Sequence, residues 1–285
     1  MKFLGRSWCK LRWTKWVRFS DGEFGALPDQ AGFYRVRPIG MKRLMYIGQT
    51  GSSLRDRLRT LARETHREKM PFNDPHTAAP NLWAWKDASA LEYECAAAPT
   101  RLPHRVRLAK ECYLLWQYRL IRGESPLCSL GRFHPRYKKS RGRSSRVRGK
   151  KLPRGNRNPA GGHSAPPLQS RGSPADSNWM GLIWKEDRSQ RGQELPQNGL
   201  YKILSNDGRL LYVGKSNGHL LSRARSHKRT KRLPSNVKIW VSAPKVLTVK
   251  KPLGHHFLEL ENDLIASYYA RHKNAPPRQF FKARG

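Results

Sequence analysis

The sequence predicts an α/β protein of the α+β class with two small domains. Each is expected to be a mainly antiparallel three-stranded sheet flanked by helices, and a disordered basic linker is expected to join them. Two observations support this prediction. A Gly-aromatic/aliphatic-Tyr stretch followed by a second Tyr near a Gly occurs twice, at 32–48 and 199–214, with similar surroundings, which is typical of an internal duplication. Between the copies, residues 132–175 contain 13 Lys or Arg and no Asp or Glu. We therefore expect domains at 1–131 and 176–285.

Each half is predicted to begin with a β-hairpin. "GFYRVR" and "GLYKIL" alternate aromatic or β-branched residues with basic ones, which is typical of strands. "LMYIG" and "LLYVG" read as the second strands. The turn in the second half, "SNDGR", contains the strong turn signal Asn-Asp-Gly, and "PIGMKR" takes its place in the first half. A tryptophan precedes each hairpin, and we match Trp16 of the first half with Trp184 of the second half.

A basic helix is predicted after each hairpin. In the first half Leu54, Leu58 and Leu61 recur at helical spacing among arginines, and "HLLSRARSHKRTKR" is the counterpart in the second half. Later strands are predicted in matched pairs: "NLWAWKD" with "NVKIWVS", then "LEYECAA" with "KVLTVK". Each half ends in a predicted helix that carries a candidate acidic residue among apolar or basic neighbours. These residues are Glu111 and Glu261.

The segment 132–175 has almost no large apolar residues after Tyr137. Such a segment cannot bury enough surface to offset its ordering entropy, so we predict a flexible linker. One interpretation is an arm that lies along phosphates, or that places arginines of "RGR" in a minor groove. The alternative is a solvated tether.

The overall charge indicates a polyanionic partner. Lys plus Arg number 57 against 20 Asp plus Glu, giving a net charge of +37, and both predicted domains and the linker are each basic. Nucleic acid is the natural candidate, because each neutralised phosphate releases counterions.

No run of about 18 apolar residues predicts a membrane span. The N-terminus lacks the apolar core of a signal peptide, which favours a cytoplasmic location. The four cysteines form no CxxC pair, which argues against a disulfide framework or a zinc site.

Several residue types in these patterns suit phosphodiester hydrolysis. Adjacent hairpin strands can bring Tyr34 and Tyr46 to one face, where two phenols orient a water. Arg57 on the next helix can clamp a phosphate. Glu111 on the last helix can hold a divalent cation whose other ligands are mostly water, which suits Mg²⁺. The alternative for each residue alone is an ordinary strand aromatic, a solvated arginine or a surface glutamate.

The pairs "GFY…YIG" and "GLY…YVG" resemble the GIY-YIG nuclease superfamily over about 100 residues in each half. The resemblance implies a three-stranded antiparallel sheet flanked by helices. It also implies hydrolysis of DNA with one metal ion, Mg²⁺ or Mn²⁺, in which tyrosine assists the water and glutamate holds the metal. By position it assigns catalytic roles to Tyr34, Tyr46, Arg57, Glu111, Tyr201, Tyr212, Arg223, His227 and Glu261, with Glu111 and Glu261 as metal ligands.

The second copy of the motif is the more complete one. Many family members have a His or Tyr four residues after the arginine, where the second half has His227 and the first has Leu61. The family's closing asparagine is matched with Cys128 and Gln279, so it is replaced in both halves. Glu259 competes with Glu261 as the metal ligand, and apolar spacing favours Glu261. Nucleic-acid contacts are expected from exposed basic residues: Arg55, Arg59, Lys215, Arg225, Lys138, Lys139, Arg141 and Arg143.

These observations lead to the prediction of a Mg²⁺-dependent DNA endonuclease with two tandem sites, suited to restriction or host defence. The alternatives are a non-catalytic nucleic-acid-binding protein, or one cutting domain with one DNA-positioning domain. RNA is less favoured as the substrate. A monomer with two sites is compatible with the sequence, which leaves the oligomeric state, the recognition sequence and the pathway open.

Overall fold

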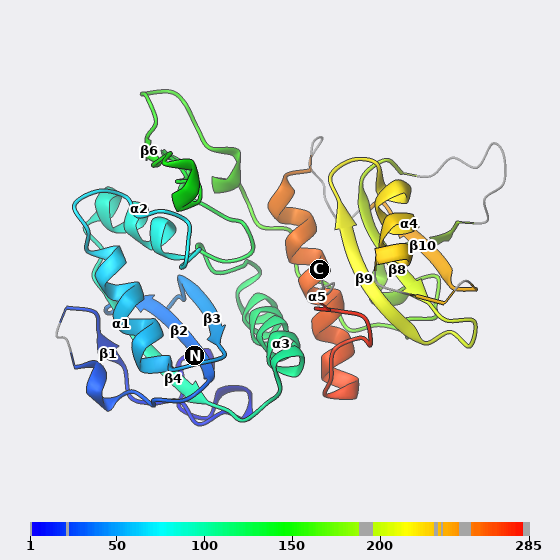
Figure 1. The fold of residues 1–285 in the computed structure, drawn as a ribbon, viewed down its shortest axis with the longest axis horizontal. Helices are drawn as coiled ribbons and strands as arrows, with labels where there is room; N and C mark the ends of the chain where they lie inside the picture. Colours follow the sequence, from blue (N-terminus) through cyan, green and yellow to red (C-terminus); the bar gives the residue numbers. More distant parts are fainter. Residues whose placement is uncertain are drawn as a thin grey trace. The chain divides into compact units, whose positions relative to one another are not determined.

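The computed structural model describes residues 2–20, 23–187, 196–230, 233–234, 236–244 and 252–281. The chain is α+β and divides into two compact units. Unit 1 comprises Met1–Leu102 with Ser125–His163, and unit 2 comprises Pro103–Glu124 with Ser164–Gly285. Each unit contains an antiparallel sheet and helices (Figure 1), so the predicted fold class is confirmed.

Unit 1 is built on a sheet in which the predicted hairpin is central. The strand order is β1 (Val17–Arg18), β4 (Tyr93–Pro99), β2 (Gly32–Pro38) and β3 (Tyr46–Thr50). The hairpin is followed by α1 (Leu54–Thr65), whose first turn is capped by Ser53, since the Ser53 Oγ accepts a hydrogen bond from the Asp56 N–H at 3.0 Å. Leu54, Leu58 and Leu61 are all buried, as their spacing predicts.

Unit 2 repeats this order of elements. Its sheet runs β7 (Lys185–Glu186), β10 (Lys238–Ser242), β8 (Gly199–Leu204) and β9 (Leu210–Ser216), and the helices that follow its hairpin are α4 (Leu220–Thr230) and α5 (Gly254–His272). Each sheet therefore has the three expected antiparallel strands and a two-residue fourth strand at one edge.

One predicted strand of the first half is a helix. "NLWAWKD" lies in α2 (Ala79–Ser89), which has a proline in its first turn, a position that favours helix initiation. The match with "NVKIWVS" that suggested a strand is therefore wrong, and Leu82 and Ala84 are buried on a helix. The strand "NVKIWVS" is β10, which pairs with the first hairpin strand of unit 2, β8. In unit 1 the strand that pairs with the first hairpin strand, β2, on its other side is β4, so β4 is the counterpart of β10. The predicted strand "KVLTVK" lies outside the described residues.

A buried cation in each unit fixes the strand that carries the first tyrosine. Arg35 is fully buried, and its guanidinium donates to the carbonyls of Leu4 and Gly5 at 3.1 Å and lies 4.3 Å from the Trp13 ring. Lys202 is equally buried, and its Nζ donates to the carbonyls of Pro174 and Asp176 at 2.8 and 2.7 Å. Side chains alternate along a strand, so Tyr34 and Tyr201 point to the opposite face.

The tryptophans around these cations correct the predicted match of Trp16 with Trp184. The Trp184 Nε1–H donates to the Trp179 carbonyl at 3.1 Å, and the Trp13 Nε1–H donates to the Trp8 carbonyl at 3.0 Å. Both ring pairs are stacked, with centroids 5.9 and 6.1 Å apart. The structural counterpart of Trp184 is therefore Trp13, and the duplication begins earlier in the chain than the sequence comparison suggested.

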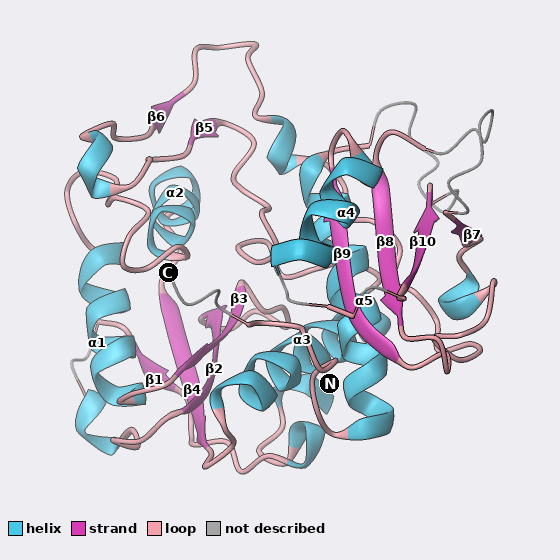
Figure 2. Cartoon of the chain, turned by 45° about the vertical axis from the view of Figure 1, so that its right-hand side comes forward, coloured by secondary structure: helices cyan, strands magenta, loops and turns pink. Residues whose placement is uncertain are grey.

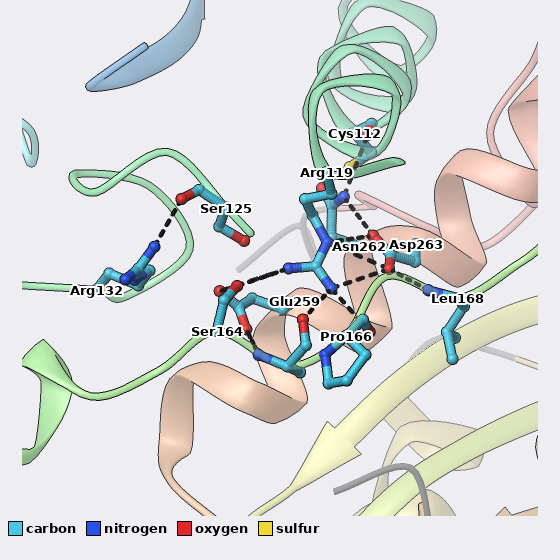
Figure 3. Close-up of polar contacts among 11 residues, drawn as sticks. Cys112, Arg119, Ser125, Arg132, Ser164, Pro166, Leu168, Glu259, Asn262 and Asp263 are labelled. Carbon is cyan, nitrogen blue, oxygen red and sulfur yellow. Dashed lines mark hydrogen bonds and ion pairs between the residues drawn. The ribbon is translucent and has the colours of Figure 1, made fainter. Parts of the chain in front are cut away.

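Helix α3 (His104–Arg122) belongs to unit 2, although the predicted boundary assigned it to the first domain. It packs along α5 (Figure 1). Arg119 of α3 is fully buried, and its Nε donates to the Asp263 carboxylate of α5 at 2.9 Å, with Glu259 3.5 Å away (Figure 3). The Trp116 indole donates to the Leu168 carbonyl at 2.8 Å. These buried contacts explain why α3 is grouped with α5.

The predicted linker is folded, which corrects the expectation of disorder. Residues 132–163 belong to unit 1, and 164–175 belong to unit 2. In the first part, β5 (Tyr137–Lys138) pairs with β6 (Lys150–Lys151) beside α2 (Figure 2). In the second part, the Ala165 and Leu168 N–H groups donate to the carboxylates of Glu259 and Asp263. The segment is ordered because its few large side chains are buried against other parts of the chain.

Among the described residues, no helix is both long enough and apolar enough to cross a membrane.

Candidate active site

Two tyrosines meet on one face of the hairpin in unit 2. In the ladder between β8 and β9, Tyr201 lies opposite Gly214, and Ile203 lies opposite Tyr212. The two tyrosines are therefore diagonal neighbours, and their stacked rings have centroids 6.0 Å apart. A Cβ on Gly214 would come within 2.3 Å of Cζ and Oη of Tyr201. Gly214 is thus required for the Tyr201 ring to cross the neighbouring strand.

Helix α4 brings a histidine to this pair. Leu220 and Ala224 are buried against the tyrosine face of the sheet, which turns His227, three residues after Ala224, toward the same face. His227 Nδ1 and the Tyr201 hydroxyl share a hydrogen bond of 2.7 Å. The His227 ring also lies edge-on to Tyr212, with centroids 5.0 Å apart. The sequence had marked His227 from its place four residues after Arg223.

Helix α5 supplies the acidic group. Burial raises the pKa of Glu261 to about 7, while the positive charges of Lys215 and Arg223 oppose this shift. Burial is the main cause that raises the pKa of Tyr212 to about 12 and the pKa of Tyr201 well above its usual value. The negative charge of Glu261 raises both pKa values further. Both phenols are therefore neutral near pH 7. Unit 2 therefore brings Tyr201, Tyr212 and His227 into contact, and the charges of Arg223 and Glu261 act on the same two tyrosines.

Unit 1 brings together only part of the corresponding set. Tyr34 lies opposite Gly48, its ring centroid is 5.9 Å from that of Tyr46, and the Arg57 Nε–H donates to the Tyr34 hydroxyl at 3.3 Å. Glu111, half-buried on α3, belongs to unit 2. Unit 1 by itself therefore holds the tyrosines and the arginine but not the predicted metal ligand.

Sequence reasoning missed a histidine in unit 1. His76 is buried, and burial and then the positive charge of Arg57 lower its pKa to about 4. The preceding residue, Pro75, accepts a hydrogen bond from Arg57 Nη1 at 3.3 Å. The Nδ1 of His76 has no hydrogen-bond partner among the described residues. His76 comes from a loop at no fixed spacing from the motif, so no sequence pattern marked it.

The residues that follow the last helices correct another predicted match. The Val213 N–H donates to the Gln279 side chain at 3.0 Å, and the Ile47 N–H donates to the Ser129 Oγ at 3.5 Å. Leu130 and Phe280, the residues that follow, both have positive φ angles, 54° and 60°. The counterpart of Gln279 is therefore Ser129 rather than Cys128. In both units this residue holds the chain after the last helix against the second hairpin strand.

Glu259 and the neighbouring histidines have structural roles. Glu259 is fully buried, and its carboxylate accepts hydrogen bonds from the Ser164 hydroxyl and the Ala165 N–H, each at 2.6 Å. The Leu253 N–H donates to His256 Nδ1 at 3.1 Å at the start of α5. Of the two competing glutamates, Glu261 is therefore the one that faces the tyrosines.

The basic residues predicted to contact nucleic acid fall into two groups. Arg59 pairs with Asp56 at 3.0 Å, Arg225 pairs with Asp187 at 2.9 Å, and Arg55 lies 3.9 Å from Asp29. Lys215 donates weakly to Asn217 at 3.5 Å and also faces Glu261. The second group lies in 136–152: Lys138, Arg141 and Arg143 are exposed, while Lys139 is half-buried and its pKa is lowered by burial.

The chain shows no significant match to any protein-family model, curated protein or solved structure. Within the described ranges, no group of three or more His, Cys, Asp and Glu side chains is arranged to hold a metal ion.

Proposed function

We propose that unit 2 hydrolyses phosphodiester bonds of DNA with the help of a divalent cation. The observation that carries this proposal is the convergence of Tyr201, Tyr212, His227 and Glu261 with two cations, Lys215 and Arg223, from four separate elements. Phosphodiester hydrolysis needs an oriented water, positive charge near the phosphate, and a proton acceptor. This group of side chains supplies each of these.

The tyrosines act as neutral hydrogen-bonding groups. Their raised pKa values exclude a substantial phenolate population near pH 7. With the His227 proton on Nε2, the Tyr201 hydroxyl can pass its proton to Nδ1 while it accepts one from the attacking water. A bond then forms between the water oxygen and phosphorus, the bond to the leaving oxygen breaks, and that oxygen takes a proton from solvent. Arg223 and Lys215 offset the negative charge that Glu261 and the phosphate bring to the site.

A single carboxylate fits Mg²⁺ better than it fits a metal that needs a protein cage. Mg²⁺ keeps several waters and is commonly bound by one or two carboxylates together with substrate phosphates. Among the charges that shift the pKa values of Tyr201 and Tyr212, the only carboxylate is that of Glu261, and no other carboxylate shifts the pKa of Glu261. Glu261 would hold the ion, which when bound supplies positive charge to the phosphate oxygens.

The test is cleavage of supercoiled plasmid in Mg²⁺ and in EDTA. We expect strand scission only with Mg²⁺. Glu261→Gln should lower the rate at least about 100-fold, since even outer groups of metal sites contribute 10–100-fold. The matched control is Asp207→Asn on the β8–β9 turn, which removes the same charge from unit 2 outside the site. Equal rates for wild type and Glu261→Gln would contradict the proposal.

A second role, in which unit 1 positions DNA for the site in unit 2, is favoured by Leu61, which stands in unit 1 where unit 2 has His227. This is the predicted alternative of one cutting and one positioning domain. A nuclease of this kind suits restriction or another defence role.

A further inference from the structure

Residues 136–152 form a two-stranded ribbon that the sequence did not reveal; we call it the basic ribbon. Tyr137 pairs with Lys151, and Lys138 pairs with Lys150. The pairing continues on both sides, because the Leu152 N–H donates to the Arg136 carbonyl at 2.8 Å and the Arg141 N–H donates to the Val147 carbonyl at 3.0 Å. A short 3-10 turn, Arg143–Ser145, closes the tip.

The inner side of the basic ribbon is fixed to unit 1. Tyr137 is buried, its hydroxyl donates to Asp87 of α2 at 2.5 Å, and its ring lies edge-on to Trp83 at 6.2 Å. A Cβ on Gly149 would lie 2.4 Å from the sulfur of Met70, so this glycine permits close contact. Arg148 donates to the Met70 carbonyl at 2.7 Å and lies 4.2 Å from the Phe72 ring. The ribbon is therefore held in one orientation.

The outer side of the basic ribbon is cationic. No acidic residue occurs between Glu124 and Asp176, and none of the described carboxylates forms an ion pair with a side chain of the ribbon. The tip also carries Val147, which is 41% exposed. Besides Arg148, whose guanidinium contacts Met70 and Phe72, the exposed basic residues of the ribbon are Arg136, Lys138, Arg141, Arg143, Arg146, Lys150 and Lys151. Surface arginines without a carboxylate partner keep their full charge for an external polyanion.

The loop of residues 70–75 joins the basic ribbon to the tyrosines of unit 1. Residues 70–74 contact the ribbon: the Asn73 N–H donates to the Arg141 carbonyl at 3.1 Å, and Asp74 accepts from the Arg143 N–H. The next residue, Pro75, accepts from Arg57, which donates to Tyr34. A duplex held by the ribbon would thus lie on the loop that contacts the arginine of the partial site.

We propose that the basic ribbon enters the major groove of duplex DNA, with its arginines on the groove walls and Val147 toward the bases. This inference rests on the proposed action on DNA. The major groove of B-DNA is about 12 Å wide and admits a two-stranded β-ribbon, and apolar side chains contact thymine methyl groups there. The major groove of duplex RNA is deep and narrow, which excludes such a ribbon. A folded and anchored ribbon fits a groove better than it fits a flexible single strand.

The experiment measures binding of a labelled DNA duplex in EDTA, so that the result does not depend on cleavage. The test variant is R141A/R143A/R146A at the tip. The control variant, R12A/K15A/R18A, removes the same charge from exposed residues elsewhere in unit 1. We expect the tip variant to weaken binding at least about tenfold more than the control. It should also reduce the slope of log K against log salt by about 0.9 for each phosphate that the protein no longer neutralises. Equal weakening by the two variants would overturn the proposal.

Chemical footprinting identifies the groove. Dimethyl sulfate methylates guanine N7 in the major groove and adenine N3 in the minor groove. Wild type should protect guanine N7, and the tip variant should lose this protection while its thermal unfolding is unchanged. Protection of adenine N3 alone, or equal dependence on the tip for duplex RNA of the same sequence, would refute insertion in the major groove. An absence of cleavage by wild type in Mg²⁺ would count against the proposed function and leave the binding result intact.

Discussion

The two units share a hairpin with paired tyrosines, yet they differ in what surrounds these tyrosines. In unit 2, His227 and Glu261 come to Tyr201 and Tyr212 from two helices of the same unit. In unit 1, Tyr34 contacts Arg57, and the helix that carries Glu111 belongs to unit 2. The duplicated motif therefore keeps the hairpin with its two tyrosines in both units, whereas the position of His227 is occupied by Leu61 in unit 1. The predictions below test this difference.

The largest effect is expected where α3 is held in unit 2. Asp263→Ala would leave Arg119 charged and fully buried without its closest partner. Breaking a buried pair in this way costs about 3–5 kcal/mol of unfolding free energy. The control is Asp56→Ala, because the Arg59–Asp56 pair is exposed and such pairs contribute about 1 kcal/mol or less. Urea unfolding measures both. Similar destabilisation by the two variants would show that α3 depends little on this pair.

The next effect concerns the histidine that only unit 2 has at this position. His227→Ala should lower the rate of plasmid cleavage about 100-fold, the lower range for loss of a positioned proton acceptor. The control is His272→Ala, since His272 packs against Tyr268 at the end of α5. His76→Ala in unit 1 should leave the rate within about threefold of wild type. A rate reduction by His76→Ala equal to that by His227→Ala would mean that the two units contribute equally.

A smaller effect is expected from the glycines beneath the tyrosines. A Cβ at Gly214 would lie 2.3 Å from Tyr201, and one at Gly48 would lie 2.5 Å from Tyr46 and 2.7 Å from Tyr34. Overpacking of this kind costs about 1–3 kcal/mol, so both alanine variants should be destabilised, Gly214→Ala more so. Gly218→Ala is the control, because its Cβ would meet no atom within 4 Å. Unchanged melting temperatures for Gly214→Ala would contradict the close ring contact.

The smallest effect is a difference in pH dependence. Burial lowers the pKa of His76 and of His134 in unit 1 to about 4. Between pH 6.5 and 4 the unfolded chain binds protons that the folded unit does not, so unit 1 loses stability as pH falls, by about 2 kcal/mol for each histidine at pH 5.

Unit 2 responds in the opposite sense at Glu261, whose pKa burial raises to about 7. Between pH 7 and 4.5 the folded unit binds the extra proton, so acid stabilises unit 2. His272, whose pKa is lowered by burial, reduces this gain. Hydrogen–deuterium exchange pulsed at one labelling pH, after equilibration in urea at pH 7 and pH 5, would resolve the units. Parallel changes in both units would contradict these assignments.

The sequence predicted the parts of each site that depend on local spacing. The strand alternation of Tyr34 and Tyr46, the helical spacing of Leu54, Leu58 and Leu61, and the position of His227 after Arg223 were sufficient to place those side chains. Their neighbours lie within a hairpin or within one helix turn. Local rules fix such contacts.

The sequence did not predict contacts that depend on distant partners. Composition indicated disorder around Tyr137, because its burial against Asp87 and Trp83 of α2 is not visible locally. The short apolar run of α2 was matched with the strand "NVKIWVS" of the second half. The buried pair of Arg119 and Asp263 joins residues 144 positions apart, so nothing near α3 showed that it would pack in unit 2.

The most direct measurement of the central claim is the product distribution when supercoiled plasmid is cut by wild type, Glu111→Gln and Glu261→Gln in Mg²⁺. If only unit 2 holds a complete site, Glu111→Gln cuts with the same ratio of nicked to linear product as wild type, and Glu261→Gln is inactive. If Glu111→Gln converts a linearising enzyme into one that only nicks, each unit cuts one strand, and the difference between the two sites is contradicted.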